Sequence, residues 1–402
     1  MEHFTILARD AQTRARAGVL RTRRGDVHTP AFMPVGTQAS VKSLTPDEIR
    51  ATGSEIILAN TYHLMLRPGL EIIQAAGGLH AFMGWPHPIL TDSGGFQVYS
   101  LASLREVTER GVRFRSHIDG SLHELTPESV IALQLGFGSD IIMPLDDVVG
   151  YDSDLECQRE AADRTHRWLL RALDYFRAVV DADDPARPWL FGIVQGGFDL
   201  DLRRRSCDFV AGLPLDGCAI GGLSVGEPKP VMLAFLEEVA RLLPEDKPRY
   251  LMGVGSPEDL WVAVAAGIDL FDCVHPTRVA RHGALYTPEG RVDITSSRYR
   301  AHFGPVDERC DCLACTQFTA AYLNHLFRAR ELLAYRLATI HNLRFIQREM
   351  ERIRRAIKEG RFVIELEEFL ARYRPADQEA AAVQRRRRAE AKRLEEVRDV
   401  DE

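Results

Sequence analysis

The sequence predicts an α/β protein built on a (β/α)8 TIM barrel, and two observations carry this prediction. Eight short apolar runs without period-two alternation are separated by segments of helical periodicity, as expected of strands buried on both faces of a parallel sheet. Most of these runs end in polar residues or glycines, at the edge where a barrel builds its active site. The runs lie at residues 30–36, 55–61, 88–95, 140–147, 189–197, 217–223, 249–255 and 267–273.

The competing architecture is a doubly wound sheet, which needs a glycine-rich phosphate turn after its first strand. The segment "VGTQAS" at residues 35–40 is not such a turn. Two intervening helices also have readable starts. "TPDE" at 45–48 and "SPED" at 256–259 combine a hydroxyl N-cap, a proline at the first helical position and an acid at the third. Gly53 and Gly267 are expected to end these helices.

The chain divides into a barrel, an insertion and a tail. The barrel, with an N-terminal β extension, is expected to occupy residues 1–273, and a β-hairpin at 111–125 could rim its mouth. A cysteine-containing subdomain at 274–350 would be inserted near the end of the barrel. A helical segment at 351–375 would complete the barrel, and the charged tail at 376–402 is expected to be a frayed helix or disordered.

Composition narrows the class of protein. The 402 residues carry a formal net charge of -7, with 45% apolar and 27% charged residues, as in ordinary globular enzymes. No apolar run approaches the roughly 20 residues that span a bilayer, and the N-terminus lacks the apolar core of a secretory signal. Seven cysteines, mostly scattered, fit a reducing compartment. We therefore expect a cytoplasmic protein that neither contacts membranes nor coats nucleic acid indiscriminately.

Three cysteines, Cys310, Cys312 and Cys315, lie within six positions and are spaced too tightly for local disulfides. They suit three corners of a tetrahedral Zn²⁺ site, and a histidine would supply the fourth. The spacing favours His341, on a later helix that zinc would bring back onto the cysteine turn. The other candidates are His325 and His302. A shell of three thiolates and one imidazole leaves no open position, so the predicted zinc is structural.

Two aspartates end the third and eighth predicted strands. Asp92 precedes two glycines in "TDSGG", and Asp272 lies in "LFDC", on the opposite side of an eight-strand ring. Two carboxylates facing each other in a barrel mouth are equipped for glycosidic bond chemistry, one at the anomeric carbon and one transferring protons. The simpler alternative is that each acid caps a helix or pairs with an arginine.

Other strand ends outline a pocket for a flat base. Gln195 supplies both a donor and an acceptor, and the backbone at 221–222 offers exposed N–H groups. Met252 and Phe96 could sandwich a ring. Asp146 could accept from an N–H pair such as that of guanine.

Together these motifs resemble the tRNA-guanine transglycosylases (queuine tRNA-ribosyltransferases) of bacterial type. The resemblance covers roughly residues 30 to 350, in the family's order. It rests on "TDSGGFQVYSL", "MPLDDV", "IVQGG", "IGGLSVGE", "YLMGVG", "LFDCVHPTRVARHG", "CDCLACTQ" and "TIHNL". It implies a TIM barrel with an inserted zinc-binding subdomain, and His341 as the fourth zinc ligand.

The resemblance also implies roles for single residues. Asp272 would attack C1′ of the wobble guanosine and form a covalent ribosyl-enzyme, while Asp92 would act as general acid and base. The target base would leave its stack to enter the pocket. The residues implied to bind the base are Asp92, Phe96, Asp146, Gln195, Gly222, Leu223 and Met252. Those implied to hold the tRNA anticodon loop are Arg278 and Arg281.

Three positions at which members of the family differ bear on the substrate. Phe96 stands where many bacterial members of the family have a tyrosine. Val148 is the residue type that resembles eukaryotic members at its position. Val225 is the bulkier bacterial choice and leaves little room for the cyclopentenediol of queuine. We therefore expect the 7-deazaguanine base 7-aminomethyl-7-deazaguanine (preQ1) as substrate of a homodimer, with queuine as the alternative.

Two other functions are compatible with a barrel that carries a zinc site. A non-catalytic tRNA-binding subunit should lack one of the two aspartates, and both are present. A zinc hydrolase would need histidine and carboxylate ligands clustered at strand ends, and none cluster there.

The helices of the subdomain are also rich in arginine, which usually indicates a solvated face. Beside a tRNA-modifying barrel these arginines could contact phosphates or a dimer partner: Arg328, Arg330, Arg336, Arg344, Arg348, Arg352, Arg354 and Arg355.

Overall fold

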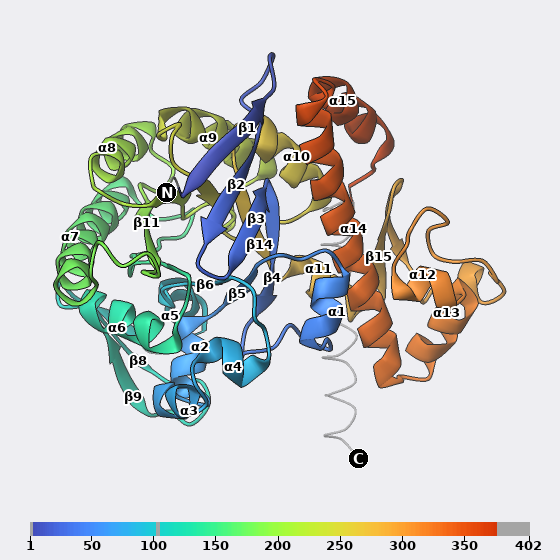
Figure 1. Cartoon of the computed structure of the whole chain (residues 1–402), viewed down its shortest axis with the longest axis horizontal. Coiled ribbons are helices and arrows are strands. Elements are labelled where there is room, and N and C mark those ends of the chain that lie inside the picture. Colours follow the sequence, from blue (N-terminus) through green and yellow to red (C-terminus); the bar gives the residue numbers. More distant parts are fainter. Residues whose placement is uncertain (1–2, 102–104, 376–402) are drawn as a thin grey trace, which may run out of the picture.

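A closed ring of parallel strands forms the centre of the molecule, in a computed structural model that describes residues 3–101 and 105–375 (Figure 1). The order around the ring is β10-β11-β12-β13-β14-β4-β5-β6. The predicted TIM barrel is therefore confirmed. Its strands are β4 (Ala31–Gly36), β5 (Ile57–Ala59), β6 (Ile89–Thr91), β10 (Ile141–Ile142), β11 (Trp189–Val194), β12 (Gly217–Ile220), β13 (Arg249–Leu251) and β14 (Leu270–Cys273).

Every barrel strand lies within one of the eight predicted apolar runs, but most are shorter. The run 140–147, for example, contains only a two-residue strand, β10. Several strands end directly before a polar residue, as β5, β6 and β11 do before Asn60, Asp92 and Gln195. β10 ends two residues before Pro144, which has no N–H to offer the ladder. Inside the ring, buried side chains such as Met33, Leu90, Phe191 and Tyr250 pack into one cluster, so the barrel is a filled core.

Helices surround the ring (Figure 1). They are α1 (Pro46–Ala51), α2 (Thr61–Leu66), α3 (Leu70–Ala75), α4 (Leu79–Met83), α5 (Gly95–Leu101), α6 (Pro127–Phe137), α7 (Leu155–Val179), α8 (Leu200–Ala211), α9 (Lys229–Leu242), α10 (Pro257–Ala265), α11 (His275–Ala280) and α15 (Phe362–Arg372). α1 begins at Thr45 with the predicted reciprocal capping bonds to Glu48. The predicted cap at Ser256 is wrong in detail: its hydroxyl donates to the Asp259 carboxylate, which Lys229 also binds at 2.8 Å.

Two small antiparallel sheets flank the barrel. The N-terminal sheet, β1 (Phe4–Arg9), β2 (Arg16–Thr22) and β3 (Gly25–Thr29), lies at the end where the barrel strands begin. There Arg16 forms a buried ion pair with Asp269, just before β14. The predicted hairpin at 111–125 is present as β8 (Val112–Arg115) and β9 (Leu122–Leu125), with β7 (Arg105–Val107) as a third strand.

The cysteine-containing segment lies beside the barrel, and the long helix α14 (Leu332–Lys358) runs between the two (Figure 1). Gln347 on α14 donates to the Phe32 carbonyl in β4 at 3.0 Å. The segment contains β15 (Ala284–Thr287), β16 (Gly290–Asp293), a 3₁₀ turn (Ser297–Tyr299), α12 (Leu313–Gln317) and α13 (Ala320–Arg328).

The predicted domain limits at 273 and 350 stay a prediction, and α14 continues through the second of them. The predicted tail, 376–402, lies outside the described residues. Among the helices described, none combines the length and apolar character that crossing a bilayer requires.

Candidate active site

Asp92 follows β6 directly, and its buried carboxylate is held by three donors. The amides of Asn60 and Gln97 donate to Oδ2 at 2.5 and 2.9 Å, and the Thr61 N–H donates to Oδ1 at 2.9 Å. Burial raises the pKa of Asp92 to about 7, and the nearby charge of Asp272 adds to the increase. A carboxyl group with this pKa can both donate and accept a proton at neutral pH.

Asp272 lies in β14 and is held through one oxygen only. The Tyr250 hydroxyl and the Gly253 N–H both donate to Oδ1, at 2.6 and 2.8 Å. No residue in the described part of the chain donates to Oδ2, which is therefore available to attack a substrate. Burial raises the pKa of Asp272 above its usual value and that of Tyr250 well above 10, so the tyrosine stays a donor.

The two aspartates are closer around the ring than the sequence suggested. Only β4 and β5 separate β6 from β14, so Asp92 and Asp272 are three strands apart rather than opposite each other. All barrel strands run parallel, so both carboxylates lie at the same, C-terminal mouth. The electrostatic effect of Asp272 on the pKa of Asp92 reflects this proximity.

Asp146 and Gln195 form a second polar pair, at the ends of the neighbouring strands β10 and β11. Gln195 Nε2 donates to Asp146 Oδ2 at 2.8 Å, and Ser93 Oγ donates to Oδ1 at 3.1 Å. Burial raises the pKa of Asp146 to about 6. Gly95 is required here because a Cβ at that position would lie 2.8 Å from the Asp146 carbonyl oxygen.

The loop after β12 contains Gly222, whose φ of +66° favours glycine. A Cβ there would collide with Gln195 Oε1, so the backbone passes directly beside the Gln195 amide. The N–H groups of Ser224 and Val225 both donate to the Glu227 carboxylate, at 2.5 and 2.8 Å. Because N–H and C=O point in opposite directions across a trans peptide, the Leu223 carbonyl faces away from Glu227.

The predicted stacking residues come from two further elements. Phe96, on α5, is 47% exposed, which is unusual for a large aromatic side chain. Met252 directly follows β13 and is half-buried. Their strand-end and helix-start positions place both at the barrel mouth.

The three cysteines and His341 come together in a buried cluster whose ligand atoms all lie within 4.8 Å of one another. His341 Nδ1 is 3.3 to 3.8 Å from the three sulfurs. Its Nε2 lies 2.7 Å from the Tyr286 carbonyl oxygen, which fixes the proton on Nε2 and leaves Nδ1 free to bind a metal. The cluster is thus able to hold a metal ion. The alternatives lie elsewhere: His325 is exposed, and His302 contacts the Pro305 carbonyl.

Comparison with known proteins identifies the family. A family model described as queuine tRNA-ribosyltransferase matches residues 10–375. A queuine tRNA-ribosyltransferase of Dictyoglomus turgidum is 53% identical over 376 residues, covering 94% of this chain and 96% of the relative. Those of Desulforudis audaxviator and Symbiobacterium thermophilum are 54% and 50% identical, covering 92% and 96% of this chain and 97% and 94% of the relatives. The chain belongs to the queuine tRNA-ribosyltransferase family. It is therefore a pentosyltransferase.

In this queuine tRNA-ribosyltransferase family member, Arg278 lies on α11, immediately after the Asp272 strand, and Arg281 directly follows the helix as its C-cap. Arg278 is exposed, and no carboxylate among the described residues pairs with it. Arg281 donates to the Thr277 carbonyl at 2.9 Å, and burial lowers its pKa, with the charge of Arg278 adding to the effect. Two cations therefore lie beside the mouth, and neither forms an ion pair with a carboxylate of residues 3–101 or 105–375.

Most of the eight arginines bind carboxylates or carbonyls of the protein itself. This corrects the expectation of a solvated or phosphate-binding face. Arg344 binds Asp311 and Glu351, and Arg352 binds Glu365. The same holds for Arg336, Arg348 and Arg354, which contact Glu48, Asp307 and the Pro30 carbonyl. These bonds dock α14 on the barrel and on the cysteine turn. Three of the eight have no such partner among the described residues: Arg328, Arg330 and Arg355.

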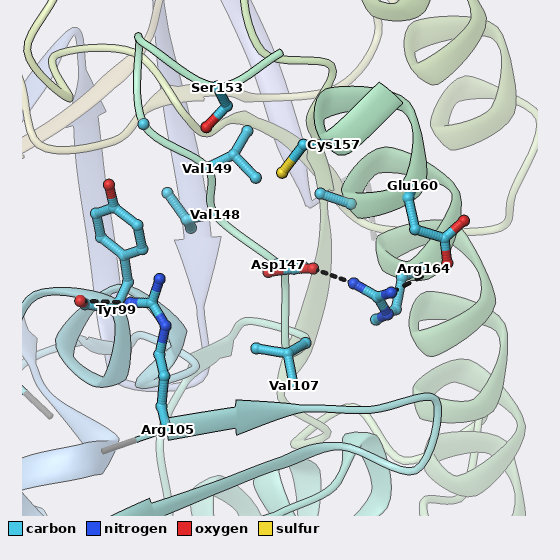
Figure 2. A pocket seen from close by; sticks show the side chains of 12 residues that line it. Tyr99, Arg105, Val107, Asp147, Val148, Val149, Ser153, Cys157, Glu160 and Arg164 are labelled. Carbon is cyan, nitrogen blue, oxygen red and sulfur yellow. Dashed lines mark hydrogen bonds and ion pairs between the residues drawn. The ribbon is translucent and has the colours of Figure 1, made fainter. Parts of the chain in front are cut away.

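Asp147, another predicted strand-end acid, turns away from Asp146. It lines a separate cavity of ≈ 420 Å³, where it pairs with Arg164 at 2.5 Å (Figure 2). Figure 2 shows Tyr99 and Arg105 on the other side of this cavity, with Val148 between them and α7. No pattern in the sequence indicates that these consecutive aspartates have different partners.

Sequence reasoning also missed the residues that orient the two aspartates. Asn60 and Tyr250 lie inside predicted strand runs, 55–61 and 249–255, and being polar residues in apolar runs they could have been identified. Gln97 lies on α5, and only the fold brings it to Asp92.

Proposed function

We propose that this chain exchanges the wobble guanine of tRNA for preQ1 through a covalent ribosyl-aspartate intermediate, a step of queuosine biosynthesis. The observation that supports it most is the difference between two carboxylates at one barrel mouth. Asp272 has one oxygen without a donor among the described residues, whereas Asp92 is fully bonded and has a pKa of about 7. The first arrangement suits a nucleophile and the second a proton carrier.

In the first half-reaction, Asp272 Oδ2 forms a bond to C1′ of the ribose as the C1′–N9 bond breaks. The electron pair goes to N9, which takes the proton from the neutral Asp92 carboxyl, and guanine leaves. In the second half, N9–H of the incoming base gives its proton to Asp92, and N9 attacks C1′. The bond to Asp272 then breaks and restores the carboxylate. Two inversions give overall retention at C1′.

The purine edge would be read by Asp146, Gln195 and the Gly222 N–H. With a pKa of about 6, Asp146 is mostly ionised at neutral pH and can accept from both N1–H and the 2-amino group of guanine. Gln195 and the Gly222 N–H would donate to the base oxygen. Phe96 and Met252 would stack on the two faces, which agrees with the exposed ring of Phe96.

The substituent of the incoming base would meet the Leu223 carbonyl, which faces away from Glu227. A carbonyl oxygen accepts well from the aminomethyl ammonium of preQ1. Val225 is half-buried, and its N–H is bound to Glu227, so the branched side chain has little freedom to make room for a cyclopentenediol. We therefore favour preQ1 over queuine.

The metal proposed for the Cys310, Cys312, Cys315 and His341 cluster is Zn²⁺, one per chain. Three thiolates and one imidazole are ligands that zinc prefers over harder cations. A closed shell of four protein ligands holds a fold together and offers no position for substrate, so the zinc would be structural. When bound, the ion would tie α14 to the cysteine turn, and it takes no part in the base exchange.

The tRNA anticodon loop would lie over α11, with Arg278 and Arg281 contacting phosphates.

We also propose a homodimer in the cytoplasm. The cysteine-containing segment and the start of α14 carry four exposed large apolar side chains: Phe303, Leu313, Tyr322 and Leu332. Aromatic side chains such as Phe303 and Tyr322 are enriched at protein interfaces. Light scattering of the purified chain should give twice the mass of one chain, and a monomer would contradict the proposed assembly.

Incorporation of radiolabelled guanine, preQ1 and queuine into unmodified tRNA tests the proposed function. We expect guanine and preQ1 to enter the wobble position and queuine to compete poorly. Equal use of queuine would contradict the argument from Val225 while leaving the exchange reaction intact. No incorporation of any base by the zinc-loaded chain would favour the alternative, a non-catalytic tRNA-binding subunit.

A further inference from the structure

Arg203, on α8, is fully buried, and its guanidinium binds backbone carbonyls at the ends of two neighbouring strands. Nε donates to the Gly197 carbonyl at 2.9 Å, and Nη1 donates to the carbonyls of Val194 and Gly221 at 3.2 and 2.7 Å. Nη2 donates to the Gly222 carbonyl at 3.1 Å. One side chain therefore joins the loop after β11 to the loop after β12.

This guanidinium has no counter-ion: no carboxylate among the described residues forms an ion pair with it. Burial lowers the pKa of Arg203 to about 10, so the group remains charged at neutral pH. Burying a charge whose hydrogen-bond partners are all backbone carbonyls is costly, and an apolar side chain of similar volume would often serve stability as well or better. The charge at this position therefore indicates a role other than packing.

The bonds of Arg203 determine where the neighbouring N–H groups point. The Gly221 carbonyl and the Gly222 N–H belong to one planar peptide and point in opposite directions. With the carbonyl held by Arg203, the Gly222 N–H points away from the Arg203 guanidinium. The Val194 carbonyl and the Gln195 N–H share another peptide, and the latter donates to Ser206 Oγ at 3.1 Å, one turn further along the same helix.

The two loops also fit each other with no spare room. A Cβ at Gly222 would collide with the Gln195 amide oxygen, and a Cβ at Gly196 would lie 2.8 Å from the Arg203 backbone nitrogen. The Gln195 amide in turn reaches Asp146 at 2.8 Å. A change in the Arg203 bonds would thus shift the groups that line the pocket edge.

We propose that Arg203 is a positioning residue for base recognition, which presets the Gln195 side chain and the Gly222 N–H before a base arrives. This inference rests on the proposed function, because it assigns those two groups to the purine edge. Arg203 itself touches neither base nor ribose. It acts by holding two peptide planes in the orientation that the base requires, which lowers the cost of ordering them on binding.

The test compares Arg203→Lys and Arg203→Gln with Arg249→Lys. Arg249 is a matched control: it is buried, burial lowers its pKa to about 10, and it donates to the carbonyls of Leu243 and Pro244 at 2.7 and 3.0 Å. It lies at the first residue of β13, at the other end of the barrel. For each variant we would measure KM for guanine, KM for tRNA, kcat and the melting temperature.

We expect the Arg203 variants to raise KM for guanine by at least about tenfold, which corresponds to one misplaced hydrogen bond of about 1.4 kcal/mol. KM for tRNA should stay within about twofold, and Arg249→Lys should change neither constant while losing comparable thermal stability. The lysine variant should retain more base affinity than the glutamine variant, because it keeps the charge and part of the donor set.

An unchanged KM for guanine in folded Arg203 variants would overturn the inference, as would equal changes in the Arg203 and Arg249 variants. If the Arg203 variants do not fold, Ser206→Ala decides, since it loosens the Gln195 peptide without removing a buried charge. KM for guanine should then rise severalfold, and no rise would refute the inference. A wild-type enzyme that exchanges no base would instead contradict the proposed function.

Discussion

Replacing Tyr250 by phenylalanine should shift the acid limb of the pH–rate profile. The substitution removes the 2.6 Å bond from the hydroxyl to Asp272 Oδ1 and leaves the 2.8 Å bond from the Gly253 N–H. A hydrogen bond to a charged group is worth about 1.5–3 kcal/mol. At 1.36 kcal/mol per unit, its loss should raise the pKa of Asp272 by about 1–2 units, on top of the increase that burial already causes.

The sign of this effect follows from the role of Asp272, which must be ionised to attack C1′. A higher pKa leaves less carboxylate at any given pH, so the loss of activity should grow as the pH falls and become small near pH 9. We would measure kcat/KM for labelled guanine incorporation between pH 5 and 9. Tyr286→Phe is the control, because this buried hydroxyl has no hydrogen-bond partner among the described residues. An acid limb that stays in place in Tyr250→Phe, or moves equally in Tyr286→Phe, would refute the reasoning.

Three further predictions concern the carboxylates and the metal. Gln97→Met removes a 2.9 Å donor that lowers the pKa of Asp92, so the alkaline limb, where protonated Asp92 is lost, should move upward in single-turnover profiles; no movement would exclude Asp92 as the acid. Gly95→Ala places a Cβ 2.8 Å from the Asp146 carbonyl oxygen and should raise KM for guanine at least tenfold; wild-type affinity would argue against Asp146 as a base contact. His341→Ala should lower bound zinc, measured by atomic absorption, and the melting temperature by several degrees; full retention of zinc would show that His341 is not a ligand.

The sequence was sufficient to predict the barrel, because strands buried on both faces need continuous apolar runs, and all eight runs contain a strand. It also predicted which residues reach the mouth, since Asp92, Gln195 and Asp272 each lie at the C-terminal end of a strand. Strand lengths were overestimated because the runs include residues that lie beyond the sheet, such as Asn60 after β5 and Gln195 after β11.

The hydrogen bonds and ion pairs between side chains could not be predicted from the sequence, because they join residues that are distant along the chain. The arginines of α14 read as a solvated face, yet Arg344 reaches Asp311 and Arg352 reaches Glu365. In the same way Asp146 and Asp147 are adjacent, but Asp146 binds Gln195 whereas Asp147 binds Arg164. Arg203 reads as one of three consecutive arginines on a surface helix, and only the fold shows that it is buried.

The central claim is that Asp272 carries the ribose covalently, and trapping that species tests it most directly. Wild-type enzyme mixed with unmodified tRNA, without free base, should give a protein–RNA band that survives denaturing electrophoresis and disappears when guanine is added. Asp272→Asn should give no such band and no guanine exchange, while binding tRNA and zinc like the wild type. Base exchange by Asp272→Asn at the wild-type rate would contradict the account.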